Sequence, residues 1–110
     1  MRTQQMSTQR LDQLRSMLLE QQNFRRDQLA QLHIPGPHGP LSSNVPEIFG
    51  ELAAGARAAL RDVRAALDRM DAGSYGRCVQ CGGQIGLERL EILPQAALCM
   101  QCQRAEPAAG

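Results

Sequence analysis

The sequence contains no lysine and no tryptophan, and it has only one tyrosine and two phenylalanines. All 12 basic residues are therefore arginines, and with 11 acidic residues the net charge is +1. This balance argues against a protein whose main task is to coat nucleic acid, because such proteins carry a strongly basic face. The scarcity of aromatic residues argues against a deep globular core. Alanine and leucine dominate instead, which favours helices packed side by side.

Long apolar runs are also missing. No stretch is long enough to cross a bilayer, and the first ten residues, MRTQQMSTQR, lack the apolar segment of a secretory signal. We therefore expect a cytoplasmic protein with no membrane partner. We also expect no enzyme, because the sequence offers neither a His-Asp-Ser set nor paired carboxylates for acid–base chemistry.

Two long segments have helical periodicity. In residues 3–33, Gln21, Gln22 and Arg25 interrupt a stripe of leucines, and Phe24 is expected to fill part of that gap. The stripe consists of Leu11, Leu14, Leu18, Leu29 and Leu32.

A second helix is predicted over residues 45–72. Asn44 and Glu47 have the spacing of a helix N-cap and its reciprocal partner, and Gly73 is suited to the position just past the end. Its apolar positions alternate between spacings of three and four, which is the pattern of a coiled-coil seam. They are Phe49, Ala53, Ala56, Leu60, Val63, Leu67 and Met70.

The segment between the two helices, residues 34–44, reads IPGPHGPLSSN and cannot continue a helix. Two helices of similar length joined by a short loop predict an antiparallel coiled-coil hairpin over residues 1–73, with its tip at 34–44. Residues 74–110 are predicted to form a separate small module with a short C-terminal helix. The fold class is thus mainly α. A plain structural or dimerising coiled coil has the same pattern in the helices.

All the cysteines lie in that module, with the spacing Cys-x2-Cys-x17-Cys-x2-Cys. This spacing is typical of a zinc site, and Gly82 and Gly83 follow the first pair where the backbone must curl towards sulfur. Four thiolates complete a tetrahedral shell around one Zn²⁺ and leave no position for water, so the site is predicted to be structural. The predicted ligands are Cys78, Cys81, Cys99 and Cys102.

Other uses of the thiols fit less well. A redox pair needs only one Cys-x-x-Cys, an iron centre of the rubredoxin type is expected to have more aromatic packing, and disulfides are rare in the cytoplasm. Metal binding also supplies stability that a few apolar residues could not provide alone. Those residues are Tyr75, Ile85, Leu87, Leu90, Ile92 and Leu98.

Residues 66–103, ALDRMDAGSYGRCVQCGGQIGLERLEILPQAALCMQCQ, resemble the DksA/TraR family of bacterial transcription regulators. The similarity includes the Gly-x-Tyr-Gly that leads into the first cysteine pair, the Cys-Gly after it, the Ile-Gly-x-x-Arg-Leu-Glu segment and the following proline. The upstream hairpin fits the family by pattern alone, and the chain is most similar to the short members.

The resemblance implies a regulator that is not an enzyme and does not read a specific DNA sequence. It implies direct binding to RNA polymerase, with the coiled coil inserted into the secondary channel and the zinc module on the rim outside. We expect a cytoplasmic monomer that modulates transcription initiation.

Two departures from the family pattern concern activity. The tip usually carries an Asp-x-x-Asp-x-Ala motif, whereas this chain has no acidic residue between Asp27 and Glu47. An acid-free tip cannot make the same charge-assisted contacts. Members that respond to ppGpp carry an arginine just before the proline, where this chain has Leu93. We therefore expect little or no response to ppGpp.

Other polar residues are open to more than one interpretation. His33 and His38 are expected to be exposed to solvent rather than to bind metal. Arg89 and Glu91 are expected either to brace the module against the hairpin or to contact the channel rim of the polymerase. Asp71 lies near a helix C-terminus, where an acid is unfavourable, so it is expected to have a specific partner.

A further set of arginines on the second helix forms either a solvated face or a polymerase contact: Arg57, Arg61 and Arg64. Tyr75 is expected to pack between the hairpin and the module.

Two other functions remain as alternatives. A zinc-capped coiled-coil adaptor, or a divergent paralogue, is favoured by the acid-free tip. A thiol redox sensor would release zinc on oxidation of the cysteines.

Overall fold

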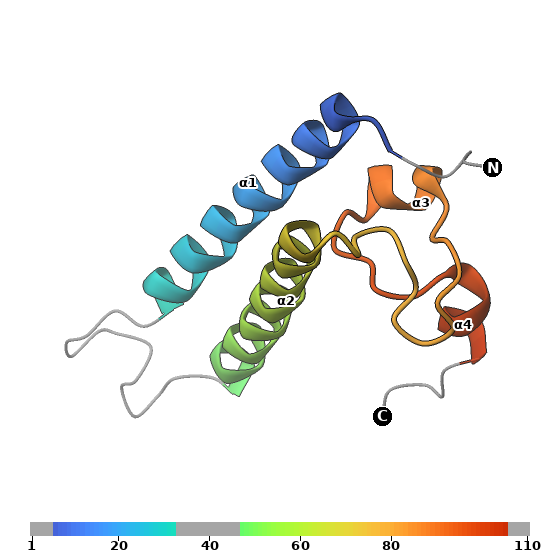
Figure 1. Cartoon of the computed structure of the whole chain (residues 1–110). Helices are drawn as coiled ribbons and strands as arrows, with labels where there is room; N and C mark the ends of the chain where they lie inside the picture. The colour runs from blue at the N-terminus through green and yellow to red at the C-terminus, as the bar shows by residue number, and fades with distance from the viewer. Residues whose placement is uncertain (1–5, 33–46, 106–110) are drawn as a thin grey trace.

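The structure is a computed structural model, which describes residues 6–32 and 47–105. It contains the helices α1 (Thr8–Leu32), α2 (Glu47–Ala72), α3 (Leu87–Ile92) and α4 (Met100–Ala105). Helices α1 and α2 lie side by side and run in opposite directions, and the cysteine-containing part of the chain folds beyond the C-terminal end of α2 (Figure 1). The mainly helical hairpin, the small module and its short C-terminal helix are thus confirmed. None of these helices has an apolar stretch long enough to span a bilayer.

The interface between α1 and α2 follows the predicted seam. Leu14 and Leu18 of α1 are buried, as are Leu60 and Val63 of α2. Ala66, which was not part of the predicted seam, is also fully buried. Burying a leucine or valine side chain contributes about 1.5–3 kcal/mol, so these few contacts supply much of the free energy that holds the hairpin together.

Helix α1 begins later than the predicted start at Thr3. The hydroxyl of Ser7 accepts a hydrogen bond from the backbone N–H of Arg10 at 3.0 Å, and its carbonyl accepts one from Leu11 at 3.0 Å. A serine whose side chain accepts a hydrogen bond from the backbone N–H three residues later is an N-cap. The helix therefore begins at Thr8. Residues 1–5 lie outside the part of the chain that the structure describes.

The middle of α1 differs from the prediction at Phe24. Its side chain is 61% exposed and does not fill the gap in the leucine stripe. Arg25 continues the leucine stripe and is partly buried. Successive residues of an α-helix are rotated by about 100°, so Phe24 points away from that stripe. The Arg25 guanidinium lies over the Phe24 ring, 5.3 Å from its centre.

Helix α2 ends as the sequence predicts. Gly73 has a φ of 81°, its N–H donates to the carbonyl of Met70 at 3.2 Å, and the N–H of Ser74 donates to Arg69 at 2.9 Å. This pair of bonds is the Schellman motif, which needs a residue that tolerates positive φ. The predicted cap pair Asn44 and Glu47 cannot be compared, because Asn44 lies outside the described residues.

The small module does not have a core of its own. Leu14 of α1 is buried together with Cys78, Ile85 and Leu90, and Met6 and Met70 pack against this cluster. Tyr75 packs against both this cluster and the one around Leu18 and Val63, which confirms its place between the hairpin and the module. The module therefore depends on apolar side chains of α1 for its stability as well as on the metal.

Candidate metal centre

The first cysteine pair lies on a tight turn. The N–H of Cys78 donates to the carbonyl of Gly83 at 2.7 Å, and the N–H of Gly82 donates back to Cys78 at 2.9 Å. Gly82 has a φ of 77°, a conformation that favours glycine. The N–H of Gly83 points at the Cys81 sulfur, 3.4 Å away. The predicted curl of the backbone towards sulfur is confirmed for Gly83, whereas the N–H of Gly82 bonds to a carbonyl instead.

The second pair lies at the start of α4. The N–H of Cys102 donates to the Cys99 sulfur at 3.5 Å, and the N–H of Gln103 donates to the Cys99 carbonyl at 2.8 Å. The two cysteine turns are also joined directly, because the N–H of Val79 donates to Ala97 at 2.9 Å. Sulfur atoms far apart in sequence are in this way held by backbone hydrogen bonds.

The four sulfur atoms fit a single tetrahedral cation. All four lie within 4.8 Å of one another, and the Cys81 and Cys99 sulfurs are 3.9 Å apart. With Zn–S bonds of about 2.3 Å, the edge of a regular ZnS₄ tetrahedron is about 3.8 Å. The thiols are free, and a separation of 3.9 Å is far beyond a disulfide bond. The donor set is thus that of a C4 zinc site.

The electrostatics of the thiols also favour a cation. Burial raises the pKa of Cys78, but hydrogen bonds from the backbone at Cys81, Cys99 and Gln80 outweigh it and bring the pKa down to about 6. Hydrogen bonding to Cys78, together with burial, raises the pKa of Cys102 to about 12. Cys102 therefore tends to keep its proton, which it shares with Cys78 in a hydrogen bond. A divalent cation at the centre would displace that proton and bind the thiolate.

Arg89 braces the second cysteine turn. Its Nε donates to the carbonyl of Leu98 at 3.1 Å, and its Nη1 lies 3.1 Å from the sulfur of Met100. These two residues flank Cys99. Arg89 thus braces the module internally rather than against the hairpin, a role that sequence reasoning did not anticipate.

Within residues 6–32 and 47–105, two ion pairs join α1 to other parts of the chain. Glu91 pairs with Arg10, and Asp71 pairs with Arg15 at 3.3 Å. The expectation that Asp71 has a specific partner is confirmed. Glu91 links α3 of the module to the beginning of α1, whereas Asp71 links α2 to α1 within the hairpin. His33 and His38 lie outside the described residues.

The sequence matches a family of known zinc fingers. Residues 73–107 match the model of the prokaryotic dksA/traR C4-type zinc finger. A curated protein from Haemophilus influenzae, RNA polymerase-binding transcription factor DksA, is 38% identical over 47 residues, which are 43% of this chain and 32% of that protein. The DksA of Escherichia coli K12 is 34% identical over 47 residues, 43% of this chain and 31% of that protein. These alignments thus span about a third of each relative's length.

Solved structures extend the similarity to the hairpin. Transcription factor DksA2 from Pseudomonas aeruginosa superposes with a TM-score of 0.68 at 27% identity, over 90% of this chain and 84% of the other. The DnaK suppressor protein from Agrobacterium tumefaciens gives a TM-score of 0.66 at 25% identity, over 87% and 93% of the two chains. The fold and site define a coiled-coil hairpin with a C4-type zinc finger. Residues 73–107 match the zinc finger of the dksA/traR family, and the hairpin has the same fold as these solved relatives.

Proposed function

We propose that this protein is a transcription regulator that binds RNA polymerase directly and inserts its hairpin into the secondary channel. The observation that carries the proposal is the long two-helix hairpin with a zinc finger at its base, an arrangement shared with DksA2 over 90% of this chain. Helix α1 has 25 residues, so the hairpin is roughly 38 Å long at about 1.5 Å per residue. A slender rod of that length suits a narrow pore.

In this proposal the two parts of the chain have different tasks. The hairpin, residues 1–73, enters the channel, and the finger, residues 74–110, rests on the rim and fixes the depth of insertion. The shared core around Leu14 and Cys78 supports this division, because it joins the two parts rigidly at the base. The protein would act as a cytoplasmic monomer, without enzymatic activity and without reading a specific DNA sequence.

We further propose that one structural Zn²⁺ is held by all four cysteines. A C4 family match and sulfur atoms within 4.8 Å of one another support this assignment. With four thiolate ligands the ion has no position for a reacting water, so its contribution is stability. The ligands would be Cys78, Cys81, Cys99 and Cys102.

The proposed regulator responds little to ppGpp. Leu93 occupies the position before Pro94, and it is partly exposed without a charge to offer to a phosphate. The chain contains no lysine at all. The acid-free tip, whose residues lie outside the described part, is expected to weaken or alter the effect on initiation.

The test is co-purification with core RNA polymerase, followed by competition with another factor that occupies the secondary channel. The proposal predicts binding at micromolar concentration and loss of binding when the competitor is added. An adaptor for some other partner would show neither result. In vitro transcription with and without ppGpp then measures the expected insensitivity.

A further inference from the structure

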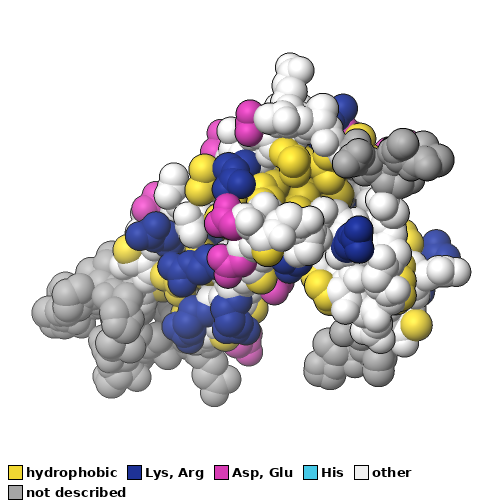
Figure 2. Space-filling model, viewed as in Figure 1, with side chains coloured by type: hydrophobic (Ala, Val, Ile, Leu, Met, Phe, Trp, Pro, Cys, Tyr) yellow, Lys and Arg dark blue, Asp and Glu magenta, His cyan; other side chains and the backbone are white. Residues whose placement is uncertain are grey.

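Four arginines gather on one flank of the hairpin, towards the end formed by Leu32 and Glu47. Arg57, Arg61 and Arg64 recur along α2 at spacings of four and three, which places them on one side of the helix. Arg26 of α1 lines the same groove as Arg57. All four side chains are exposed, and Figure 2 shows basic side chains gathered over this part of the two helices. We call this set the arginine flank.

No arginine of the flank forms an ion pair with a carboxylate in the described part of the chain. The ion pairs found there are Arg10–Glu91 and Arg15–Asp71, both near the finger, and no acid lies within 4.0 Å of an arginine of the flank. Like charges at these helical spacings destabilise a helix, and Asp68, four residues after Arg64, offsets part of that cost. A charge-bearing partner therefore explains the arginine flank better than the stability of α2 does.

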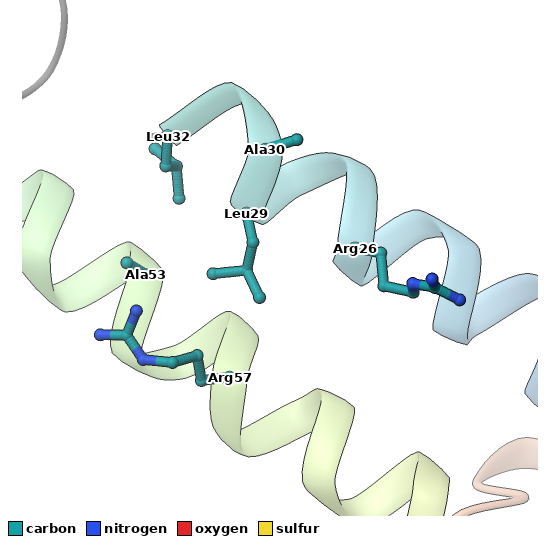
Figure 3. A pocket seen from close by; sticks show the side chains of 6 residues that line it. All are labelled: Arg26, Leu29, Ala30, Leu32, Ala53 and Arg57. Atoms are coloured by element: carbon teal, nitrogen blue, oxygen red, sulfur yellow. The ribbon is translucent and has the colours of Figure 1, made fainter. Parts of the chain in front are cut away.

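Between the arginines lies an apolar groove of about 470 Å³. Leu29 and Leu32 point from α1 towards α2, where Ala53 forms the opposite wall, and Arg57 extends along α2 beside them (Figure 3). Arg26 also lines the groove, and its guanidinium extends along α1 away from Leu29 and Leu32. A ligand for this surface must combine negative charge with an apolar group.

We infer that the arginine flank and its groove are a docking face for an acidic segment of a protein partner, one of whose apolar side chains enters the groove. Guanidinium groups bind carboxylates through paired hydrogen bonds, which suits aspartate and glutamate side chains. The groove offers leucine and alanine side chains rather than donors, so it accepts an aliphatic side chain.

Nucleic acid suits this surface less well than an acidic peptide. From Arg57 to Arg64 the flank extends only about 10 Å at about 1.5 Å per residue. Nearer the finger, α2 continues with the acids Asp68 and Asp71, so the basic surface ends there and is too short to follow a nucleic-acid backbone. The groove is lined by aliphatic side chains and arginine, so no aromatic ring offers itself for base stacking.

The inference rests on the proposed function in one respect. If the protein binds RNA polymerase, the partner is an acidic segment of that polymerase. The first test does not need the polymerase. Full-length zinc-loaded protein labelled with ¹⁵N is titrated with a synthetic peptide of sequence EDLEDL. We expect amide shifts at Leu29, Ala53 and Arg57 that weaken as salt is added.

Charge-reversal variants distinguish binding at the arginine flank from general attraction between the peptide and a basic protein. The double variant Arg57→Glu/Arg61→Glu should lose these shifts, whereas Arg77→Glu/Arg104→Glu, which changes the charge equally on exposed residues of the module, should keep them. Shifts that are absent, or equal in both variants, overturn the inference. Tighter binding of a single-stranded oligonucleotide to the same residues overturns it too.

The second test measures affinity for core RNA polymerase at low salt. The flank variant should bind about tenfold more weakly than the native chain, with the loss mainly in the association rate, and the module variant should bind closer to the native level. Equal binding by the flank variant contradicts the inference while leaving the proposed function intact. Failure of the native chain to bind refutes the proposed function, and the peptide titration then decides the inference alone.

Discussion

At the scale of single residues, Tyr75 joins the hairpin to the finger. Its hydroxyl donates to the carbonyl of Pro94 at 2.8 Å, and its ring packs against both apolar clusters. Burial raises the pKa of Tyr75 from 10.0 to about 12, although the nearby charge of Arg69 lowers it in part. The folded state thus prefers the neutral phenol, which can still donate its proton.

This shift predicts a loss of stability at alkaline pH. Below pH 10 the phenol is neutral in both states, so its contribution is fully present. Between pH 10 and about 12 only the unfolded chain ionises, and the free energy of unfolding falls as the pH rises. Denaturant titrations of the zinc-loaded protein over this range measure the fall.

Tyr75→Phe is the control for the alkaline loss. It should cost about 1 kcal/mol near neutral pH, because the hydrogen bond to Pro94 is removed. Its free energy of unfolding should then change less with pH than that of the native chain. Equal slopes in the two proteins would show that another group is responsible.

Arg89 gives a second prediction at this scale. Arg89→Lys keeps the charge but loses the fork that reaches Leu98 and Met100 together, so the Cys99 turn should loosen. We expect faster zinc release to a coloured chelator and a loss of about 1–2 kcal/mol in stability. Arg104→Lys, at an exposed position, should release zinc at the native rate. Equal rates for both variants would remove Arg89 from the role of brace.

Sequence reasoning succeeded at residues whose role is local. The Cys-x2-Cys spacings, Gly73 and Gly82 act within a few positions of the chain, so their geometry can be read from the order of residues. The start of α1 was placed too early because Ser7 has no glutamate or glutamine three positions later to mark the cap. The roles of Leu14 and Arg89 depend on tertiary packing, which periodicity does not report.

At the scale of elements, α1 is part of the finger as well as of the hairpin. Leu14 is 1% exposed and lies in one cluster with Cys78, Ile85 and Leu90. The ion pair between Arg10 and Glu91 lies in the same region. Exposed ion pairs contribute little, so the packing of Leu14 is the stronger link between the two parts.

Leu14→Ala should therefore damage the finger from a distance in sequence. Truncation of a buried leucine costs about 2–5 kcal/mol, and here part of that cost falls on the cysteine turns. Hydrogen exchange at the amides of Cys78 and Ile85 should accelerate, and chelators should remove zinc more easily. Leu19→Ala is the control, since Leu19 is 43% exposed. Unchanged exchange in the Leu14 variant would mean that the finger folds independently.

The segment between α1 and α2 carries a prediction about output. If the acid-free tip limits the effect on initiation, then Gly36→Asp/Gly39→Asp should strengthen it in transcription assays with purified polymerase. Affinity for the polymerase should change much less. A variant whose effect equals that of the native chain would show that the missing carboxylates are not the cause.

At the scale of the whole molecule, zinc, finger and hairpin depend on one another. Zinc orders the cysteine turns, the ordered turns complete the cluster around Leu14, and that cluster fixes the direction of the hairpin relative to its base. Removal of zinc should therefore weaken the proposed binding to the polymerase, even though in that proposal the helices rather than the finger enter the channel. Dialysis against a chelator, followed by addition of Zn²⁺, tests whether the loss is reversible.

The insertion itself can be measured directly. Fe²⁺ placed at the active centre of RNA polymerase in exchange for Mg²⁺ generates hydroxyl radicals that cut nearby protein. If the hairpin occupies the secondary channel, this chain should be cut between residues 33 and 46, and a competing channel factor should abolish the cuts. A bound chain that is left intact there, or that is cut only in the finger, would contradict the account.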